Sequence, residues 1–172
     1  DSVFGSGFLP QTSLLWEKAT EPAAKKGIRV VNLRIGIVLD PEGGAMRMML
    51  PAFRLGIAGR LGNGRQYMSW IAREDLLGII EYVLTNDALR GPVNAVAPQP
   101  VTNQEFTKTL GKVLHRPTIL PAPAFVLRMI FGEMGQALLL ASTRVVPTKL
   151  LRIGYTFRYS TLEEALRSML AR

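Results

Sequence analysis

The chain has 172 residues, of which 48% are hydrophobic, and this is enough for one globular domain with a sizeable core. Its net charge of +8 permits an anionic partner but specifies none. The absence of cysteine excludes disulfides and thiolate metal sites, and the single histidine, His115, excludes a histidine-rich metal site.

The first part of the chain alternates helix and strand patterns, which is typical of an α/β fold. Apolar spacing predicts a helix over residues 12–26 that stops at Gly27. Residues 28–39, IRVVNLRIGIVL, are rich in β-branched side chains and predict a parallel strand that is covered on both faces. After a turn, residues 45–56 predict a helix that Pro51 should kink or restart.

Two more helices and a strand are predicted before residue 116. Residues 73–84 have helical apolar spacing, and we expect Asp75 to be a solvated charge in the first turn. Residues 91–96 predict a short strand. Thr102 and Glu105 have the spacing of a capping box, which predicts the start of a helix at this point.

The last part of the chain predicts mostly helix after an extended link. Residues 124–141 predict one helix or two, but charged side chains interrupt this apolar region too early for a membrane span, so we expect no membrane partner. Ser160 and Glu163 predict a second capping box. A cluster of prolines favours a boundary near residue 120, with residues 1–120 and 121–172 as separate parts.

The most glycine-rich stretch is residues 56–70, GIAGRLGNGRQYMSW, whose first glycines have the spacing of a dinucleotide-binding loop. Such a loop joins a buried strand to the start of a helix. Here the preceding residues look helical and no helix begins before about residue 73. A plain surface loop is one alternative. A ligand-binding loop is another, because planar and hydrogen-bonding side chains gather there: Arg60, Arg65, Gln66, Tyr67 and Trp70.

Four segments together resemble the C-terminal half of the NAD(P)-dependent epimerase/dehydratase family, within the extended short-chain dehydrogenase/reductases. They are LRIGIVL, GRQYMSWI, GPVNAVAP and GYTFRY. The subgroup is that of nucleoside-diphosphate-sugar epimerases or cell-division-inhibitor-like proteins, and residues 121–172 are similar to its short C-terminal domain of unknown function. The resemblance implies an α/β fold with part of a Rossmann-type, doubly wound sheet, a mostly helical C-terminal domain, and further strands upstream of Asp1.

The resemblance also implies a site for NADP or NAD, with NADP favoured. In the family, the strand that matches residues 32–39 ends beside the nicotinamide. The residues that inherit a cofactor contact are Arg34, Ile35, Gly36, Ile37 and Val38. The alternative for Ile35 and Ile37 is a core strand. Arg34 is the informative residue, because a charge in a buried strand needs an anionic or carbonyl partner.

The glycine-rich stretch matches the family's substrate-side loop, so Arg60, Gln66 and Trp70 are expected to approach a small-molecule substrate such as a nucleotide sugar. For Trp70, the alternative is a position in the core. We expect a cytoplasmic protein, with a homodimer as a candidate assembly. A basic nucleic-acid-binding module is the alternative from another class, which we disfavour because few aromatic residues lie among the basic ones.

The family's catalytic pair, a tyrosine followed four residues later by a lysine, is absent from this chain. If Glu17 marks the usual acidic position of that helix, the two places fall on Leu9 and Ser13. Neither side chain can transfer a proton in the required way, and no catalytic residue is assigned. Two hypotheses follow: an oxidoreductase or epimerase represented by its substrate-side half, and a non-enzymatic NAD(P)-binding regulatory or interaction protein of the same fold.

Overall fold

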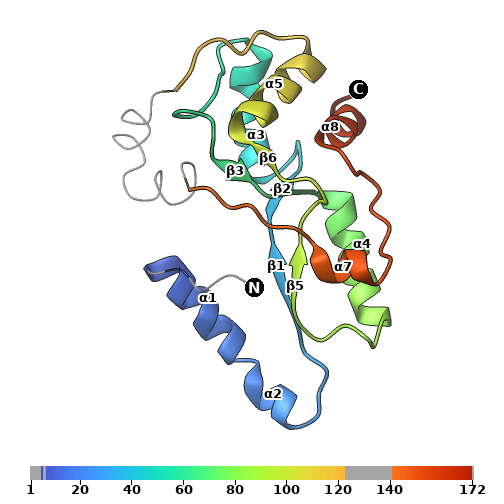
Figure 1. Ribbon diagram of the computed structural model, residues 1–172. Coiled ribbons are helices and arrows are strands. Elements are labelled where there is room, and N and C mark those ends of the chain that lie inside the picture. The colour runs from blue at the N-terminus through green and yellow to red at the C-terminus, as the bar shows by residue number, and fades with distance from the viewer. Residues whose placement is uncertain (1–4, 6, 123–140, 172) are drawn as a thin grey trace.

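The computed structural model describes residue 5, residues 7–122 and residues 141–171 (Figure 1). Its helices are α1 (Phe8–Lys18), α2 (Glu21–Lys25), α3 (Gly44–Arg54), α4 (Arg73–Thr85), α5 (Asn103–Leu114), α7 (Thr148–Arg152) and α8 (Leu162–Leu170). Its strands are β1 (Val31–Ile35), β2 (Ile37–Leu39), β3 (Tyr67–Met68), β4 (Trp70–Ala72), β5 (Gly91–Ala95) and β6 (Val101–Thr102). The alternation of helices with strands confirms the predicted α/β class.

The strands form three pairs, two of them parallel. β1 pairs with β5, β2 pairs with β4, and β3 pairs with β6 in the antiparallel sense. β1 and β5 run side by side through the middle of the molecule (Figure 1). The predicted strand over residues 28–39 is therefore parallel, but it starts later and is interrupted at Gly36, where the chain changes its partner strand.

Burial along this predicted strand is uneven. Leu39 is buried, whereas the side chains of Arg34 and Ile35 are exposed among the described residues. The prediction that both faces are covered therefore fails for the end of β1. The fully covered strand is β4, whose three residues have no exposed surface and for which no strand was predicted.

The first predicted helix consists of two shorter ones. α1 begins earlier than predicted, at Phe8, and the chain turns at Ala19 and Thr20 before α2. Pro22 lies in the first turn of α2, where its missing N–H costs nothing but where it cannot continue a preceding helix. Gly27 then ends the helical region with a φ of 80°, as predicted.

The middle helices follow the sequence pattern more closely. α3 continues through Pro51 to Arg54, so the helix does not restart at this proline, and a kink at Pro51 stays a prediction. α5 begins with the predicted capping box: the Glu105 amide donates to the Thr102 hydroxyl, and the Thr102 amide donates to the Glu105 carboxylate.

The second capping box lies one residue later than predicted. The Thr161 hydroxyl accepts from the Glu164 amide, and the Glu164 carboxylate accepts from the Thr161 amide. Glu163, the predicted partner, instead accepts hydrogen bonds from Lys112 of α5 and Arg167 of α8. The helix predicted over residues 124–141 lies outside the described residues except for its last position.

The hydrophobic core has two clusters that meet at β4. Trp70 and Ala72 belong to the cluster formed with β2, α3, α5 and α8, whereas Ile71 belongs to the cluster formed with α4, β5 and α7. Successive strand residues point to opposite faces, so this three-residue strand contributes to both clusters. Residues on both sides of the predicted boundary at residue 120 contribute to each cluster. The division of the chain into two domains stays a prediction.

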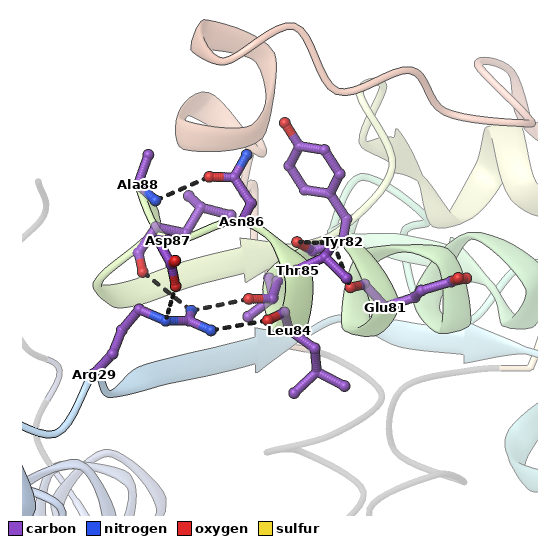
Figure 2. Close-up of polar contacts among 10 residues, drawn as sticks. Arg29, Glu81, Tyr82, Leu84, Thr85, Asn86, Asp87 and Ala88 are labelled. Atoms are coloured by element: carbon purple, nitrogen blue, oxygen red, sulfur yellow. Dashed lines mark hydrogen bonds and ion pairs between the residues drawn. The ribbon is translucent and has the colours of Figure 1, made fainter.

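Arg29 fixes the entry to β1 against the end of α4 (Figure 2). Its guanidinium donates to the carbonyl oxygens of Val83, at 2.9 Å, and Leu84, at 3.1 Å, and it forms an ion pair with Asp87 at 3.2 Å. The last carbonyls of a helix lack donors within the helix, and a positive charge suits that end of its dipole. The contact therefore satisfies the end of α4 and positions the chain that leads into β1.

Candidate functional site

The candidate cofactor region lies at the carboxyl ends of the parallel strands β1 and β5. The Gly36 amide donates to the Ala95 carbonyl at 3.2 Å, and the next amide, that of Ile37, donates to the Ser69 carbonyl at 2.8 Å. The chain thus passes from pairing with β5 to pairing with β4 within two residues. Ligands of open α/β sheets bind beyond the carboxyl ends of the strands, where neighbouring strands diverge.

Glycine is required at position 36 because the surrounding backbone leaves no space for a side chain. A Cβ atom there would lie 2.5 Å from the Ser69 carbonyl oxygen and 2.8 Å from the nearest methyl carbon of Val96. Both distances are shorter than real side chains tolerate. The close approach keeps the end of β1 and the start of β4 in fixed relative positions.

The anionic partner expected for Arg34 is Glu17 of α1. The Arg34 Nε and Nη2 atoms donate to the two carboxylate oxygens of Glu17 at 2.7 and 2.8 Å. This two-pronged hydrogen bond lowers the pKa of Glu17 and raises the pKa of Arg34. The pair connects α1 to β1, so much of the Arg34 charge is compensated within the chain.

The other predicted cofactor residues, 35–38, are consecutive in the chain but differ in the exposure of their side chains. Ile35 is 51% exposed at the end of β1, whereas Ile37 and Val38 are partly buried in β2. The amides of Gly36 and Ile37 already donate to neighbouring strands. The exposed side chain of Ile35 is therefore the group of this run that is most accessible to a ligand.

Residues 56–66 of the glycine-rich stretch form a loop between α3 and β3, and the rest of the stretch contains β3 and the first residue of β4, so that no helix follows until α4. Gly56, Gly62 and Gly64 have positive φ angles, which suit glycine in turns. Gly59 allows a close approach instead, since a Cβ there would lie 2.2 Å from the Leu120 carbonyl oxygen. The loop lacks the strand and helix that a dinucleotide loop needs, and its glycines form turns.

The structure separates the three predicted substrate-side residues. Arg60 is exposed, whereas Gln66 is buried and donates from Nε2 to the Leu61 carbonyl at 3.0 Å. Trp70 is fully buried, and its indole N–H donates to the Gln99 carbonyl at 2.9 Å. Trp70 thus occupies the core position that was its alternative, and only Arg60 presents its side chain to solvent.

Residues 142–145 run beside β3 and the residue that follows it. The Tyr67 amide donates to the Ser142 hydroxyl at 3.0 Å, and the Thr143 amide donates to the Tyr67 carbonyl at 3.1 Å. The Arg144 guanidinium lies over the Tyr67 ring, 5.1 Å from its centre. This contact was not predicted from the sequence, because nothing in the local pattern shows which strand edge the later segment follows.

Asp75 is buried, which corrects its expected role as a solvated charge. Its carboxylate accepts from the amides of Arg158 at 2.7 Å and Tyr159 at 3.2 Å. Burial raises the pKa of Asp75, although the two amides act in the opposite direction. The carboxylate therefore anchors the segment that precedes α8 to the start of α4.

A hollow of about 420 Å³ lies between the first two helices and β1, with Thr20, Ile28, Asn32 and Gly91 among its lining residues. Ile28 and Gly91 lie at or before the amino ends of their strands, so the hollow lies away from Gly36. It does not include the predicted cofactor or substrate residues.

Among residues 7–122 and 141–171, no cluster of three or more histidine, aspartate or glutamate side chains is arranged to hold a metal ion. In the same part of the chain, no helix has the length and apolar character needed to cross a bilayer.

Comparisons with known proteins connect the chain to a family. Residues 122–169 match the model of a "Domain of unknown function (DUF1731)". An epimerase family protein of Mycobacterium bovis is 46% identical over 162 residues, which are 94% of this chain and 54% of that protein. The chain therefore spans about half the length of the curated relatives that it matches.

Two solved structures are similar in both sequence and fold. The human epimerase family protein SDR39U1 (isoform 2), solved with NADPH, is 38% identical with a TM-score of 0.81, over 84% of this chain and 49% of that one. A nucleoside-diphosphate sugar epimerase from Corynebacterium glutamicum is 32% identical with a TM-score of 0.78, over 99% of this chain and 32% of that one. The likeness confirms the predicted partial Rossmann-type fold. The chain is therefore similar, over almost its whole length, to part of the epimerase family proteins, and its residues 122–169 match the DUF1731 model.

Proposed function

We propose that this chain provides the substrate-side part of an NAD(P)-dependent oxidoreductase or epimerase, with NADP favoured over NAD. The observation that carries the proposal is the change of strand partner at Gly36, at the carboxyl ends of β1 and β5. This is the place where open α/β sheets bind ligands. The human relative solved with NADPH supports the choice of cofactor.

The residues at this edge fit a planar, apolar part of a cofactor. We propose that the cofactor lies against Arg34–Val38, with the half-exposed Ile35 side chain making the main contact. Arg34 would act through Glu17, since its guanidinium already holds that carboxylate and thereby fixes α1 beside β1. When bound, NAD(P)H would supply a hydride; the chain would supply the surface that orients its ring.

The glycine-rich loop is the proposed substrate side. Arg60 has an exposed guanidinium, and no acidic side chain in the described part of the chain forms an ion pair with it. An anionic group such as the diphosphate of a nucleotide sugar would suit it, and a carbonyl substrate is also consistent with it. Gln66 and Trp70 would support the loop from its buried side, through their bonds to Leu61 and Gln99.

A non-enzymatic NAD(P)-binding protein is the second candidate function. It is favoured by the residues of α1: if Glu17 marks the usual acidic position, the family resemblance puts the catalytic tyrosine and lysine at Leu9 and Ser13. Binding and turnover are therefore separate questions for this chain. A cytoplasmic location and a homodimer also stay predictions.

The test is a calorimetric titration of the complete protein with NADPH and with NADH. Ile35→Asp should weaken NADPH binding by about tenfold or more, because it places a carboxylate against the cofactor, and tenfold corresponds to about 1.4 kcal/mol. Ile57→Asp is the matched control, since Ile57 is a similarly exposed isoleucine, 57% against 51%, in the loop after α3. Equal effects of the two variants would contradict the assigned cofactor surface.

Turnover then separates the two candidate functions. Consumption of NADPH or conversion of a nucleotide sugar, lowered by Arg60→Ala, would support the enzyme. Binding without turnover of a panel of carbonyl compounds and nucleotide sugars would support the regulatory alternative. A folded complete protein that binds neither nucleotide would contradict both.

A further inference from the structure

Ser69 connects three segments that are distant in sequence. It is buried, with 6% of its surface exposed, between the end of β3 and the start of β4. Its carbonyl oxygen accepts from the Ile37 amide at 2.8 Å. Its hydroxyl donates to the Thr143 carbonyl at 2.7 Å and accepts from the Val145 amide at 2.8 Å. One residue thus holds the candidate cofactor strand on one side and the segment of residues 142–145 on the other.

The connection to the cofactor strand is rigid. Gly36 lies so close to the Ser69 carbonyl that no side chain could be placed between them. A displacement of Ser69 therefore moves the backbone at Gly36 and Ile37 or breaks the hydrogen bond to the Ile37 amide. Packed interiors of this kind transmit small shifts instead of absorbing them.

The connection to residues 142–145 depends on the Ser69 hydroxyl. The hydroxyl uses its single donor and one of its acceptor lone pairs in these two bonds, and its removal leaves the Thr143 carbonyl and the Val145 amide without these partners. The neighbouring contacts of this segment go to Tyr67 instead. Ser69 thus links residues 142–145 by hydrogen bonds to the strand that starts at Ile37, while Asn94 of β5 holds the next residue by donating to the Val146 carbonyl.

We propose that Ser69 is a positioning residue for the cofactor, coupling the placement of residues 142–145 to the conformation of Gly36 and Ile37. The proposal rests on the proposed function, since it assigns the cofactor to Arg34–Val38. Residues 142–145 lie within the range that matches the DUF1731 model. The coupling therefore gives part of this domain of unknown function a role at the cofactor site.

The experiment compares Ser69→Ala with the unmodified complete protein by NADPH titration and by hydrogen–deuterium exchange. The variant removes both hydroxyl bonds and leaves the backbone contact between Ser69 and Ile37 chemically intact. We expect faster exchange at the amides of Val145 and Ile37 and NADPH binding weakened by roughly three- to tenfold. Ser69→Thr keeps the hydroxyl and should restore both readouts at least in part.

A second variant removes the partner of the Ser69 hydroxyl instead of the hydroxyl itself. Val145→Pro removes the amide that donates to Ser69 but changes no residue of the sheet, so it keeps the test available if Ser69→Ala does not fold. Ser142→Ala is the matched control, because it removes another hydroxyl from the same segment, one that contacts Tyr67. We expect Val145→Pro to reproduce the faster exchange at Ile37 and the weaker NADPH binding of Ser69→Ala. Ser142→Ala keeps both hydrogen bonds of the Ser69 hydroxyl and should leave NADPH affinity within about twofold.

The outcomes separate this proposal from the proposed function. Faster exchange at Val145 with unchanged exchange at Ile37 would overturn the coupling. So would unchanged NADPH affinity in Ser69→Ala and Val145→Pro when the unmodified protein binds NADPH. Failure of the unmodified protein to bind either NADPH or NADH would contradict the proposed function and the cofactor role of Ser69 together. Hydrogen–deuterium exchange at the Ile37 amide would then test only whether residues 142–145 are coupled to the strand that starts at Ile37.

Discussion

Replacement of Asp75 by alanine should detach the segment before α8 from α4. The change removes two hydrogen bonds that the amides of Arg158 and Tyr159 donate to a buried carboxylate, at 2.7 and 3.2 Å. A hydrogen bond to a charged acceptor contributes about 1.5–3 kcal/mol. Because the variant also removes a carboxylate whose burial is unfavourable, we expect a net loss of about 2–4 kcal/mol in the free energy of unfolding. Asp75→Asn keeps one acceptor and should lose about 1–2 kcal/mol.

The assay is urea unfolding of the complete protein followed by tryptophan fluorescence. The chain has two tryptophans, and Trp16 is 73% exposed whereas Trp70 is fully buried. A Trp16→Phe background therefore leaves Trp70 as the reporter within this chain. Hydrogen–deuterium exchange adds a local readout, because the amides of Arg158 and Tyr159 should lose protection in Asp75→Ala.

Glu74→Ala is the matched control. Glu74 is the neighbouring first-turn carboxylate, and one of its oxygens is buried without a hydrogen-bond partner. Its removal should change the free energy of unfolding by about 0.5 kcal/mol or less. If Asp75→Ala costs no more than Glu74→Ala, or if the two amides stay protected, the assigned role of Asp75 is wrong.

The pH dependence gives Asp75 a second test. Since burial raises its pKa above the ordinary 3.8, the folded state binds the proton more tightly than the unfolded state does. Its contribution to stability is therefore largest below the unfolded pKa and declines as the pH rises through the folded pKa. The difference in unfolding free energy between unmodified protein and Asp75→Asn should decrease from about pH 4 to about pH 7, and an increase would contradict this sign.

Three further variants test other contacts. Gly59→Ala should destabilise the fold by about 1–3 kcal/mol in urea unfolding, because its Cβ would lie 2.2 Å from the Leu120 carbonyl oxygen; no change would refute the close approach. Trp70→Phe should cost about 1–3 kcal/mol through lost volume and a lost hydrogen bond, and a neutral result would argue against its core position. Hydrogen bonds from Lys112 and from Arg167 of α8 lower the pKa of Glu163. The stability that Glu163→Gln removes should therefore be present above about pH 4.5 and be lost as the pH falls. A stability difference that persists in acid would contradict the ion pair.

Local signals in the sequence predicted the elements whose determinants are also local. The capping box of α5 was identified because both of its partners, Thr102 and Glu105, lie within one turn. The second box was placed one residue early because the sequence STLEE contains two overlapping pairs with the same spacing. A tertiary contact decides between them: Glu163 bonds to Lys112 of α5, which leaves Glu164 to cap the helix.

Errors occurred where a distant segment determines the environment. Asp75 has the sequence position of a solvated first-turn charge, but the segment at residues 158–159 covers it. The interruption at Gly36 depends on the position of Ser69, which lies between β3 and β4. Ser69 itself gave a usable signal, since a small polar residue between Met68 and Trp70 in an apolar run needs a buried hydrogen-bond partner.

The candidate site was predicted through the family resemblance more than through the residues alone. The partner expected for Arg34 exists, but its identity as Glu17 depends on how α1 lies beside β1. The glycine spacing alone suggested a dinucleotide loop, and the flanking helices identified it as something else. Which of Arg60, Gln66 and Trp70 faces solvent could not be read from a loop without regular periodicity.

The central claim is that the cofactor lies at the end of β1. The most direct measurement is hydrogen–deuterium exchange of the complete protein with and without saturating NADPH. We predict slower exchange in Arg34–Val38 when NADPH is bound, with no change in α7, which packs against the other side of β5 (Figure 1). Binding of NADPH without protection of Arg34–Val38 would contradict the claim.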